Sequence, residues 1–319
     1  MSRLYLGVDG GQSTTTALIA DVEGRIIGWG SGGPCNHVAS SEGRAKFLSA
    51  IGACLQQACG QAGLNPASIH FAAACFGFSG GAEDKQRYIP ELVRSAKYRI
   101  THDADIALTG ATGGEPGIIV IAGTGSMAFG RNAAKNTARA GGWGYIFGDE
   151  GSAFDLTRRA IRAAVRHEEG WGPETSLRSV LLEETGAEDA NTLLHWFYTD
   201  EYPRTRIASL APLVTAAAEA GDPVAREILG KAAESLASFA QGVYQQLFRS
   251  GDQLSIAYTG GVFQSMPLVA HLEKCIRHSI GIEIQRAQFN AAVGAVLEAL
   301  RLDNNPSELS HVPESNSGI

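Results

Sequence analysis

The sequence lacks the features of a membrane, secreted or nucleic-acid-binding protein. Its apolar runs are short, and the first of them, residues 4–8, ends at Asp9 and two glycines. Such a pattern fits neither a signal peptide nor a membrane span. Basic residues are outnumbered, because 26 Lys and Arg stand against 33 Asp and Glu, which gives a net charge of −7. Without a basic patch, we do not expect nucleic acid as a main partner.

Cysteine is also scarce. The five cysteines include no CxxC pair and stand at positions 35, 54, 59, 75 and 275. This spacing indicates neither a disulfide framework nor a metal site, so we expect reduced thiols that act as small buried apolar residues in a cytoplasmic protein. What the chain does have is 319 residues, 44% of them hydrophobic, with 39 Gly. That is enough for two ordinary domains or one large α/β unit.

A pattern of strand, glycine turn and returning strand occurs twice. Residues 4–20 show it around the turn at 9–13, and residues 118–130 repeat it around the turn at 123–126. Both segments are predicted to form hairpins. The copies lie roughly 115 positions apart, which is too far for a solenoid repeat and favours two related halves.

Hydrophobic spacing predicts the remaining elements. Helices are expected over residues 41–62, 89–96, 104–111, 153–166, 177–184, 205–220, 223–250 and 291–302. Further strands are expected over residues 25–29, 69–78, 99–101 and 254–258. The polar segment beyond Asp303 contains Pro and Ser, and we expect it to be disordered.

Both glycine turns are candidate phosphate sites. Glycine allows close approach and positive φ, which leaves backbone N–H groups free to meet an anion. Neither turn is a Walker loop, since no Gly-Lys-Ser/Thr follows, and neither is a dinucleotide fingerprint, since a strand follows the glycines. Either turn alone could be an ordinary hairpin, but their repetition favours two loops closing on one polyphosphate. Asp9, a carboxylate beside the first turn, suits Mg²⁺, although a hairpin cap would also explain it.

Taken in order, these motifs resemble the actin/hexokinase/heat-shock-ATPase superfamily. Residues 7–14 resemble its first phosphate motif, residues 123–126 its second and residues 259–263 its nucleoside-side motif. More specifically, the block at 141–152 (GGWGYIFGDEGS) resembles that of N-acetylglucosamine kinases. Two shorter matches to the same family are Cys35-Asn36-His37 and Thr101-His102-Asp103-Ala104. The resemblance runs from about residue 4 to about residue 300, and only the long block is specific by itself.

The resemblance implies an α/β fold of two actin-like ATPase domains, which are ribonuclease H-like, with an interdomain cleft. Residues 1–114 would form the domain with the sugar site and first phosphate motif, with helix 290–302 packing back on it. Residues 115–289 would form the second domain, with the other phosphate motif and the nucleotide site. Residues 303–319 would be a flexible tail.

The resemblance also implies an ATP- and Mg²⁺-dependent kinase acting on the 6-hydroxyl of N-acetylglucosamine or a related amino sugar. Asp103 would be the catalytic base. Asp9 is the expected metal ligand because of its place beside the first turn. The positions that match sugar-binding residues are Asn36, Ser79, Asp103, Gly141, Gly142 and Asp149. The positions that match ATP-contacting residues are Gln12, Ser13, Thr124 and Gly125. The expected ATP site also includes the other residues of the same motifs, which are Gly10, Gly11, Thr14, Gly123, Gly260 and Gly261. A homodimer is an open possibility.

Some positions depart from the family pattern. Gln12 stands where many relatives have Gly or Thr, and Val38 stands where the animal enzymes have Trp. The acceptor therefore stays open among N-acetylglucosamine, glucosamine, N-acetylmuramic acid and glucose. From the residues alone, Asp103 could equally be a helix N-cap, and Asp105 competes with it as the base. Trp143 is either a core residue or a platform for the sugar.

Other functions compete with the kinase interpretation. Asp149-Glu150 could be a solvated turn instead of part of a ligand loop. Activator ATPases of acyl-CoA dehydratases and reductases share the implied fold, but they hold an iron–sulfur cluster with Cys ligands, and no suitable Cys pair is present here. Sugar-kinase-like repressors carry a helix-turn-helix ahead of the first phosphate motif, and we do not expect one here, since that motif begins at Gly7. A non-catalytic ATP-binding protein is the third alternative, and fold alone does not decide among them.

Overall fold

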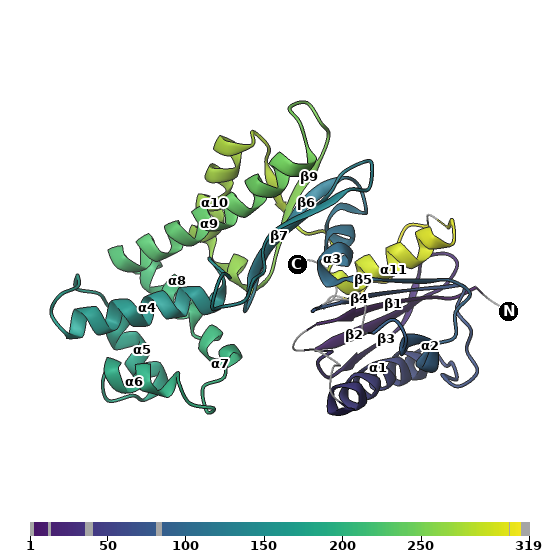
Figure 1. Ribbon diagram of the computed structural model, residues 1–319, viewed down its shortest axis with the longest axis horizontal. Coiled ribbons are helices and arrows are strands. Elements are labelled where there is room, and N and C mark those ends of the chain that lie inside the picture. The colour runs from purple at the N-terminus through teal and green to yellow at the C-terminus, as the bar shows by residue number, and fades with distance from the viewer. Residues whose placement is uncertain (1–2, 12–13, 36–40, 81–84, 306, 314–319) are drawn as a thin grey trace. The chain divides into compact units, whose positions relative to one another are not determined.

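The computed structural model describes residues 3–11, 14–35, 41–80, 85–305 and 307–313. The chain divides into two compact units (Figure 1). Unit 1 comprises residues 1–117 and 286–319, and unit 2 comprises residues 118–285. Each contains a five-stranded sheet covered by helices, which confirms the predicted α/β class. In the ranges given above, no helix combines the length and apolarity needed to cross a bilayer.

The sheet of unit 1 is mixed, with strand order β3-β2-β1-β4-β5. The strands are β1 (Tyr5–Gly10), β2 (Thr15–Ala20), β3 (Ile26–Gly32), β4 (Ala73–Phe78) and β5 (Tyr98–His102). The first three form antiparallel hairpins, as predicted, whereas β1, β4 and β5 run parallel. Gly10 is therefore opposite Phe78, and Phe78 is opposite His102. The carboxyl ends of these three strands meet at one edge of the sheet.

Helices cover both faces of this sheet (Figure 1). The helices of unit 1 are α1 (Ser41–Gln61), α2 (Ile89–Leu92), α3 (Asp103–Thr112) and α11 (Ala291–Leu302). Side chains alternate between the faces, as a pleated strand requires. Leu6 and Val8 share a buried core with Phe47 of α1, whereas Tyr5 packs in a second core with Val296 of α11. Both faces of the sheet are thus closed to water.

Strand β3 approaches α1 unusually closely. It carries glycine at three alternate positions, Gly28, Gly30 and Gly32, all of which face the helix. A Cβ atom at any of them would overlap a backbone carbonyl oxygen of α1, and the residues that carry these oxygens are Ala58, Cys54 and Ala50 respectively. The missing side chains let the strand backbone lie directly on the helix backbone.

The segment after α11 differs from expectation. Residues 303–319 were predicted to be a flexible tail, but residues 303–305 and 307–313 lie against unit 1. Ser310 N–H donates to Gly24 O, and Ile26 N–H donates to Ser310 O, each at 3.0 Å. The Asp303 carboxylate accepts hydrogen bonds from Lys97 and Tyr5. Composition predicts disorder here because it does not register these long-range partners. Residues 306 and 314–319 lie outside the described residues.

The sheet of unit 2 has strand order β10-β9-β6-β7-β8. The strands are β6 (Gly117–Ala122), β7 (Ser126–Arg131), β8 (Thr137–Gly141), β9 (Ser255–Thr259) and β10 (Ile284–Arg286). The helices are α4 (Ala153–Glu168), α5 (Leu177–Thr185), α6 (Ala190–Trp196), α7 (Arg204–Ala208), α8 (Ala211–Glu219), α9 (Pro223–Leu247), η1 (Gly261–Gln264) and α10 (Met266–Ser279). The turn between β6 and β7 is the second predicted phosphate loop.

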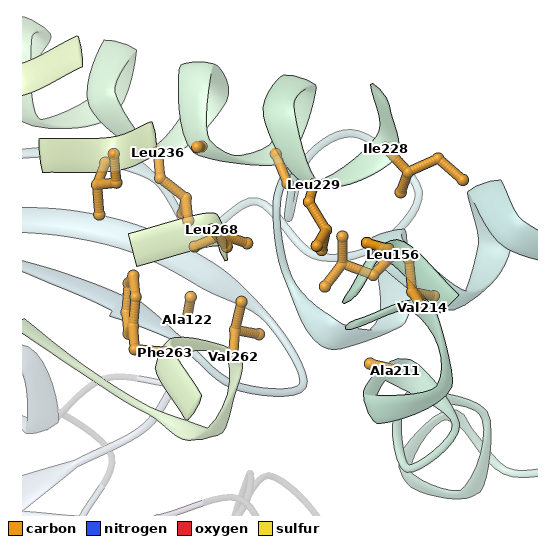
Figure 2. Close-up of a cluster of buried hydrophobic side chains, with 14 of the residues drawn as sticks. Ala122, Leu156, Ala211, Val214, Ile228, Leu229, Leu236, Val262, Phe263 and Leu268 are labelled. Carbon is orange, nitrogen blue, oxygen red and sulfur yellow. The ribbon is translucent and has the colours of Figure 1, made fainter. Parts of the chain in front are cut away.

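One large apolar core holds unit 2 together. Figure 2 shows part of it, in which Leu236 of α9 and Leu268 of α10 lie above Ala122 and Phe263. The same core extends through Leu229 to Leu156 of α4 and Val214 of α8. The long helix α9 therefore joins the sheet to the smaller helices.

Most predicted helices of unit 2 are found within a few residues of their expected bounds. The prediction over 205–220 is wrong in one respect, because two helices, α7 and α8, occupy this range. Pro212 lies in the first turn of α8, and since proline has no N–H, one continuous helix would lose a hydrogen bond there. Elements α6, α10, η1, β8 and β10 were not predicted.

Candidate functional site

The first glycine turn follows β1 directly. Gly11 N–H donates to Thr14 O at 2.9 Å, and Cys35 N–H donates to Gly11 O at 3.0 Å. Gly10 must be glycine, because a Cβ atom there would overlap the Phe78 ring. The predicted ATP-contacting residues Gln12 and Ser13 and the predicted sugar-binding residue Asn36 lie outside the described residues. Gly10, Gly11 and Thr14 form the described part of this turn at the sheet edge.

Ser79 and Asp103 lie together at the same edge. Ser79 follows β4 and Asp103 begins α3 directly after β5, so both side chains start from neighbouring strand ends. Ser79 N–H donates to Gly10 O at 3.1 Å, and the Ser79 hydroxyl donates to Asp103 Oδ2. Asp103 Oδ1 accepts from Ala104 N–H at 2.8 Å. The N-cap of α3 is His102, so Asp103 does not hold the capping position that was its alternative interpretation.

Asp9, near the end of β1, has a carboxyl group whose pKa lies well above the ordinary value. Burial raises the pKa of Asp9 to about 7, and the negative charge of Asp103 adds to this increase. Because burial and a nearby negative charge both oppose the ionisation of Asp9, a divalent cation bound there would stabilise its charged form. An oxygen donor of this kind, beside a candidate phosphate turn, fits Mg²⁺, which commonly takes one or two carboxylates together with phosphate oxygens. Throughout the described residues, no cluster of three or more metal-ligating side chains occurs.

Asp105 has a different environment from Asp103. Asp105 is buried and accepts hydrogen bonds from Arg99 Nη2 at 2.6 Å and Thr101 Oγ1 at 2.9 Å. Arg99 also forms an ion pair with Glu298 of α11. Asp105 therefore belongs to a buried network that ties β5, α3 and α11 together. Because its carboxylate is occupied by these partners, Asp105 is a poor candidate for the base.

Lys85 was not predicted to belong to the site. Its side chain is fully buried, and Nζ donates to Ser79 O at 3.2 Å and lies 5.6 Å from the centre of the Phe78 ring. Close by, the Cys35 thiol lies 2.8 Å from Thr15 Oγ1, and burial raises the pKa of this thiol. A single Lys in a polar stretch gives no sequence signal of such a position.

The second glycine turn, in unit 2, is shaped by backbone hydrogen bonds. Gly123 N–H donates to Gly125 O at 2.9 Å, and Ala153 N–H donates to Gly123 O at 2.8 Å, which ties the loop to the start of α4. The N–H groups of Thr124 and Gly125 donate to no acceptor within the described part of the chain. The loop thus presents free backbone donors, as binding of an anion requires.

Asp149 lies beneath this loop. It is buried, with φ of 62°, and its Oδ1 accepts from Ser126 N–H at 3.2 Å. Asp149 Oδ2 forms an ion pair with Arg204 of α7, and Arg204 Nη2 also donates to Thr124 O at 3.2 Å. The solvated-turn interpretation of Asp149 is wrong, since the carboxylate is enclosed. Arg204 was missed because 55 residues separate it from Asp149.

Gly141 ends β8, and Gly142 follows it beside the same loop. Their φ values are 76° and 75°, a region that favours glycine, and Gly142 N–H donates to Ser126 O at 3.0 Å. Trp143 follows and is 65% exposed, so it is not a core residue. The Arg139 guanidinium carbon lies 4.5 Å from the centre of the Trp143 ring.

Gly260 and Gly261 follow β9. Gly260 has φ of 116°, and a Cβ atom there would overlap the backbone of Ala122 at the end of β6. Phe263 N–H then donates to Gly260 O at 3.1 Å and starts the short helix η1. The predicted nucleoside-side motif is therefore a tight turn beside the strand that leads into the second phosphate loop.

The cysteines do not form a cluster site. Cys35, Cys54, Cys59 and Cys75 are buried in unit 1, and Cys275 in unit 2 is partly buried. Burial raises the pKa of Cys54 to about 12, which disfavours the thiolate that binds metals. As far as the described residues extend, this arrangement does not favour an iron–sulfur activator.

Comparison with known proteins yields close matches over most of the chain. An N-acetylmuramic acid/N-acetylglucosamine kinase of Clostridium acetobutylicum is 32% identical over 270 residues, which cover 83% of this chain and 87% of the relative. An N-acetyl-D-glucosamine kinase of Dictyostelium discoideum is 28% identical over 321 residues, which cover 93% of this chain and 98% of the relative.

A solved structure supports the same placement. A Chromobacterium violaceum protein, provisionally assigned as an N-acetylglucosamine kinase, matches with a TM-score of 0.76 at 32% identity, covering 92% of this chain and 98% of that one. The sequence model of the BadF/BadG/BcrA/BcrD ATPase family matches residues 6–299. The superfamily resemblance and the actin-like fold are thereby confirmed, and the chain belongs to the BadF/BadG/BcrA/BcrD ATPase family.

Proposed function

We propose that this protein transfers the γ-phosphoryl group of ATP to the 6-hydroxyl of N-acetylglucosamine or a closely related amino sugar. The observation that carries the proposal is the hydrogen-bonded pair of Ser79 and Asp103 beside Asp9 at the sheet edge. The amino-sugar kinases among the relatives support the choice of acceptor. We place the reaction in the cytoplasm, because five cysteines without a disulfide fit a reducing compartment.

In this proposal, Asp103 accepts the proton of the sugar 6-hydroxyl. The oxygen then bonds to the γ-phosphorus as the bond from phosphorus to the ADP oxygen breaks, which yields the sugar 6-phosphate and ADP. Ser79 donates to Asp103 Oδ2 and so orients the carboxylate. General-base catalysis of this kind contributes about 10²- to 10⁴-fold to the rate.

The glycine turns hold the nucleotide in this proposal. The free N–H groups of Thr124 and Gly125 bind phosphate oxygens. Gly10 and Gly11 contact the nucleotide at the β1 turn, where the missing side chain of Gly10 lets the turn lie against the Phe78 ring. Asp9 binds Mg²⁺, which when present offsets the negative charge of the phosphates. Gly260 and Gly261 lie on the nucleoside side.

The remaining residues select the acceptor. Backbone groups of Gly141 and Gly142 meet the acetamido substituent, and Asp149 with Asn36 binds sugar hydroxyls. If so, kcat/KM for N-acetylglucosamine exceeds that for glucose by about 10- to 100-fold, which corresponds to one or two hydrogen bonds.

A sugar panel tests the proposal. The experiment couples ADP release to a spectrophotometric readout with N-acetylglucosamine, glucosamine, N-acetylmuramic acid and glucose as acceptors. Mass spectrometry of the product then identifies the phosphorylated position. We expect the highest kcat/KM with an N-acetylated sugar. Equal efficiency with glucose would remove the amino-sugar assignment, and ADP release that no sugar stimulates would remove the kinase assignment.

A further inference from the structure

Arg204 lies where it can fix the conformation of the second phosphate loop. It begins α7, and its Nη2 contacts both the Asp149 carboxylate and Thr124 O. Its guanidinium carbon lies 5.4 Å from the centre of the Tyr145 ring and 5.8 Å from that of Phe154. The Nε donor is buried, and none of the described residues offers it an acceptor. A buried unpaired donor is unfavourable, so the position of this side chain is not explained by stability alone.

Arg204 and Asp149 together determine two consecutive peptide planes of the loop. A trans peptide is planar, and its C=O and N–H groups point in opposite directions. By holding Thr124 O, Arg204 therefore fixes the direction of the Gly125 N–H group. Asp149 Oδ1 accepts from Ser126 N–H and so fixes the next peptide. The pair thus sets the backbone on both sides of Gly125.

The contact with Gly125 is tight. A Cβ atom on this residue would lie 2.9 Å from Arg204 Nη2 and 3.0 Å from Asp149 Oδ1. The ion pair therefore fills the space in which a side chain of residue 125 would stand. A loop held this way has little freedom to turn its free N–H groups away from an anion.

We infer that Arg204 is a positioning residue that holds the Thr124–Gly125 peptide in the orientation needed to bind nucleotide phosphates, and that Asp149 acts with it as one unit. This inference rests on the proposed function. It assigns the ion pair to nucleotide binding, in addition to the sugar contact proposed for Asp149. Because the pair contacts the loop and not the nucleoside-side turn, its loss should affect phosphate groups selectively.

The test compares two ligands on the same variants. Isothermal titration calorimetry measures binding of AMP-PNP with Mg²⁺ and of adenosine to wild type, R204M and R204K. For R204M, we expect the Kd of AMP-PNP to increase by about 10- to 100-fold, the scale of a lost hydrogen bond to a charged group. The Kd of adenosine should stay within about threefold. R204K keeps the charge and should recover part of the affinity.

Arg206 provides a matched control on the same helix. Its guanidinium carbon lies 4.0 Å from the centre of the Tyr202 ring, and its Nη1 donates to Glu201 O, neither of which belongs to the loop. R206M should leave binding of both ligands unchanged. The double variant R204M/D149N is compared with R204M and D149N alone. Since the pair acts as a unit, the double variant should bind AMP-PNP no less tightly than whichever single variant has the higher Kd.

Three outcomes would overturn the inference. The first is wild-type affinity for AMP-PNP in R204M. The second is an equal loss of affinity for AMP-PNP and for adenosine in R204M. The third is a loss of AMP-PNP binding free energy in the double variant that equals the sum of the losses in the single variants. If the wild type binds AMP-PNP but phosphorylates no sugar, the proposed function fails while the binding comparison still decides the role of Arg204. If the wild type does not bind AMP-PNP, both fail.

Discussion

At the scale of single residues, two carboxylates near the start of α3 have separate tasks. Asp103 contacts Ser79 and lies close enough to Asp9 to raise the pKa of that carboxyl. Asp105, two positions further, is enclosed by Arg99 and Thr101. Residues two positions apart on a helix do not share a face, so the side chains of Asp103 and Asp105 point in different directions. Substitution at the two positions should therefore affect different properties.

The first prediction concerns Asp103. Asp103→Asn keeps the size of the side chain but removes the proton acceptor, so kcat should fall by about 10²- to 10⁴-fold. The melting temperature should change little, since Asn can still accept from Ala104 N–H. Steady-state kinetics and thermal unfolding of the same preparation check both statements.

Asp105→Asn is the matched control. It leaves Arg99 with one partner fewer in a buried network, so we expect it to reduce the free energy of unfolding by about 1–3 kcal/mol. Its kcat, measured below the unfolding range, should stay within about threefold of wild type. A fully active and stable Asp103→Asn variant would contradict the proposed mechanism, and an inactive but stable Asp105→Asn variant would move the base by two residues.

The second prediction concerns pH and Asp303. Burial alone would raise the pKa of Asp303, but hydrogen bonds from Lys97 and Tyr5 and the charges of Arg3 and Lys97 hold it below the ordinary value. The charged form is thus favoured in the folded state. Its contribution to stability is present above the unfolded pKa of about 3.9 and is lost as pH falls through the lower folded pKa.

Asp303→Asn should therefore lower the free energy of unfolding by about 1–3 kcal/mol at pH 7. The difference from wild type should shrink as pH falls below about 4, where the wild-type carboxyl takes up its proton. Urea unfolding at a series of pH values measures it. A difference that stays constant down to the acid limit would show that the charge of Asp303 does not stabilise the fold.

At the scale of elements, the start of α9 depends on one side chain. Asp222 Oδ1 accepts from Ala225 N–H at 2.9 Å as the helix cap, while Oδ2 accepts from Ser176 N–H at 2.6 Å and from Thr175 Oγ1 at 2.8 Å. The same carboxylate thus begins the long helix of unit 2 and holds the segment that leads into α5.

The third prediction follows from this double role. Asp222→Ala should lower the free energy of unfolding by about 1–3 kcal/mol, the sum of a lost cap and further lost hydrogen bonds. Asp222→Asn keeps one carbonyl oxygen as an acceptor and should cost less. Chemical denaturation of both variants makes the comparison. Equal losses would mean that the charge, and not the cap, is what α9 requires.

Elements also show how far the sequence predicts this protein. The turns after β1 and β6 were predictable, because a turn is determined by its own glycine and hydroxyl residues, which follow an apolar run in the sequence. The break at Ser209 was not, since the helical spacing continues through it and only Pro212 marks the boundary. Arg204 and Lys85 could not be found from the sequence, because their roles depend on partners brought near by folding. The order of residues 303–305 and 307–313 depends on such partners as well.

At the scale of the whole molecule, the proposed reaction draws on both units. Asp103 and Asp9 belong to unit 1, whereas the second phosphate loop and Arg204 belong to unit 2. A ligand that binds only the native chain stabilises it by mass action, by about 2.7 kcal/mol at 100 times its Kd.

The fourth prediction is therefore a thermal shift that depends on metal. AMP-PNP with Mg²⁺ at 100 times its Kd should raise the melting temperature by roughly 5–10 °C for units of this size. Replacing Mg²⁺ by EDTA should remove most of the shift, and Asp9→Asn should do the same with Mg²⁺ present. Differential scanning fluorimetry is sufficient. A shift of the same size in EDTA would contradict the metal role of Asp9.

The glycines of β3 restrict where a residue can be inserted into this protein. Two residues of a strand advance about 6.6 Å, and four residues of a helix advance about 6.0 Å. The contacts of Gly28, Gly30 and Gly32 with Ala58, Cys54 and Ala50 are spaced by these two steps. The repeats of strand and helix are thus nearly commensurate over three contacts. A one-residue insertion within either element would bring side chains where only glycine fits, so insertions should be tolerated only outside residues 28–32 and 50–58.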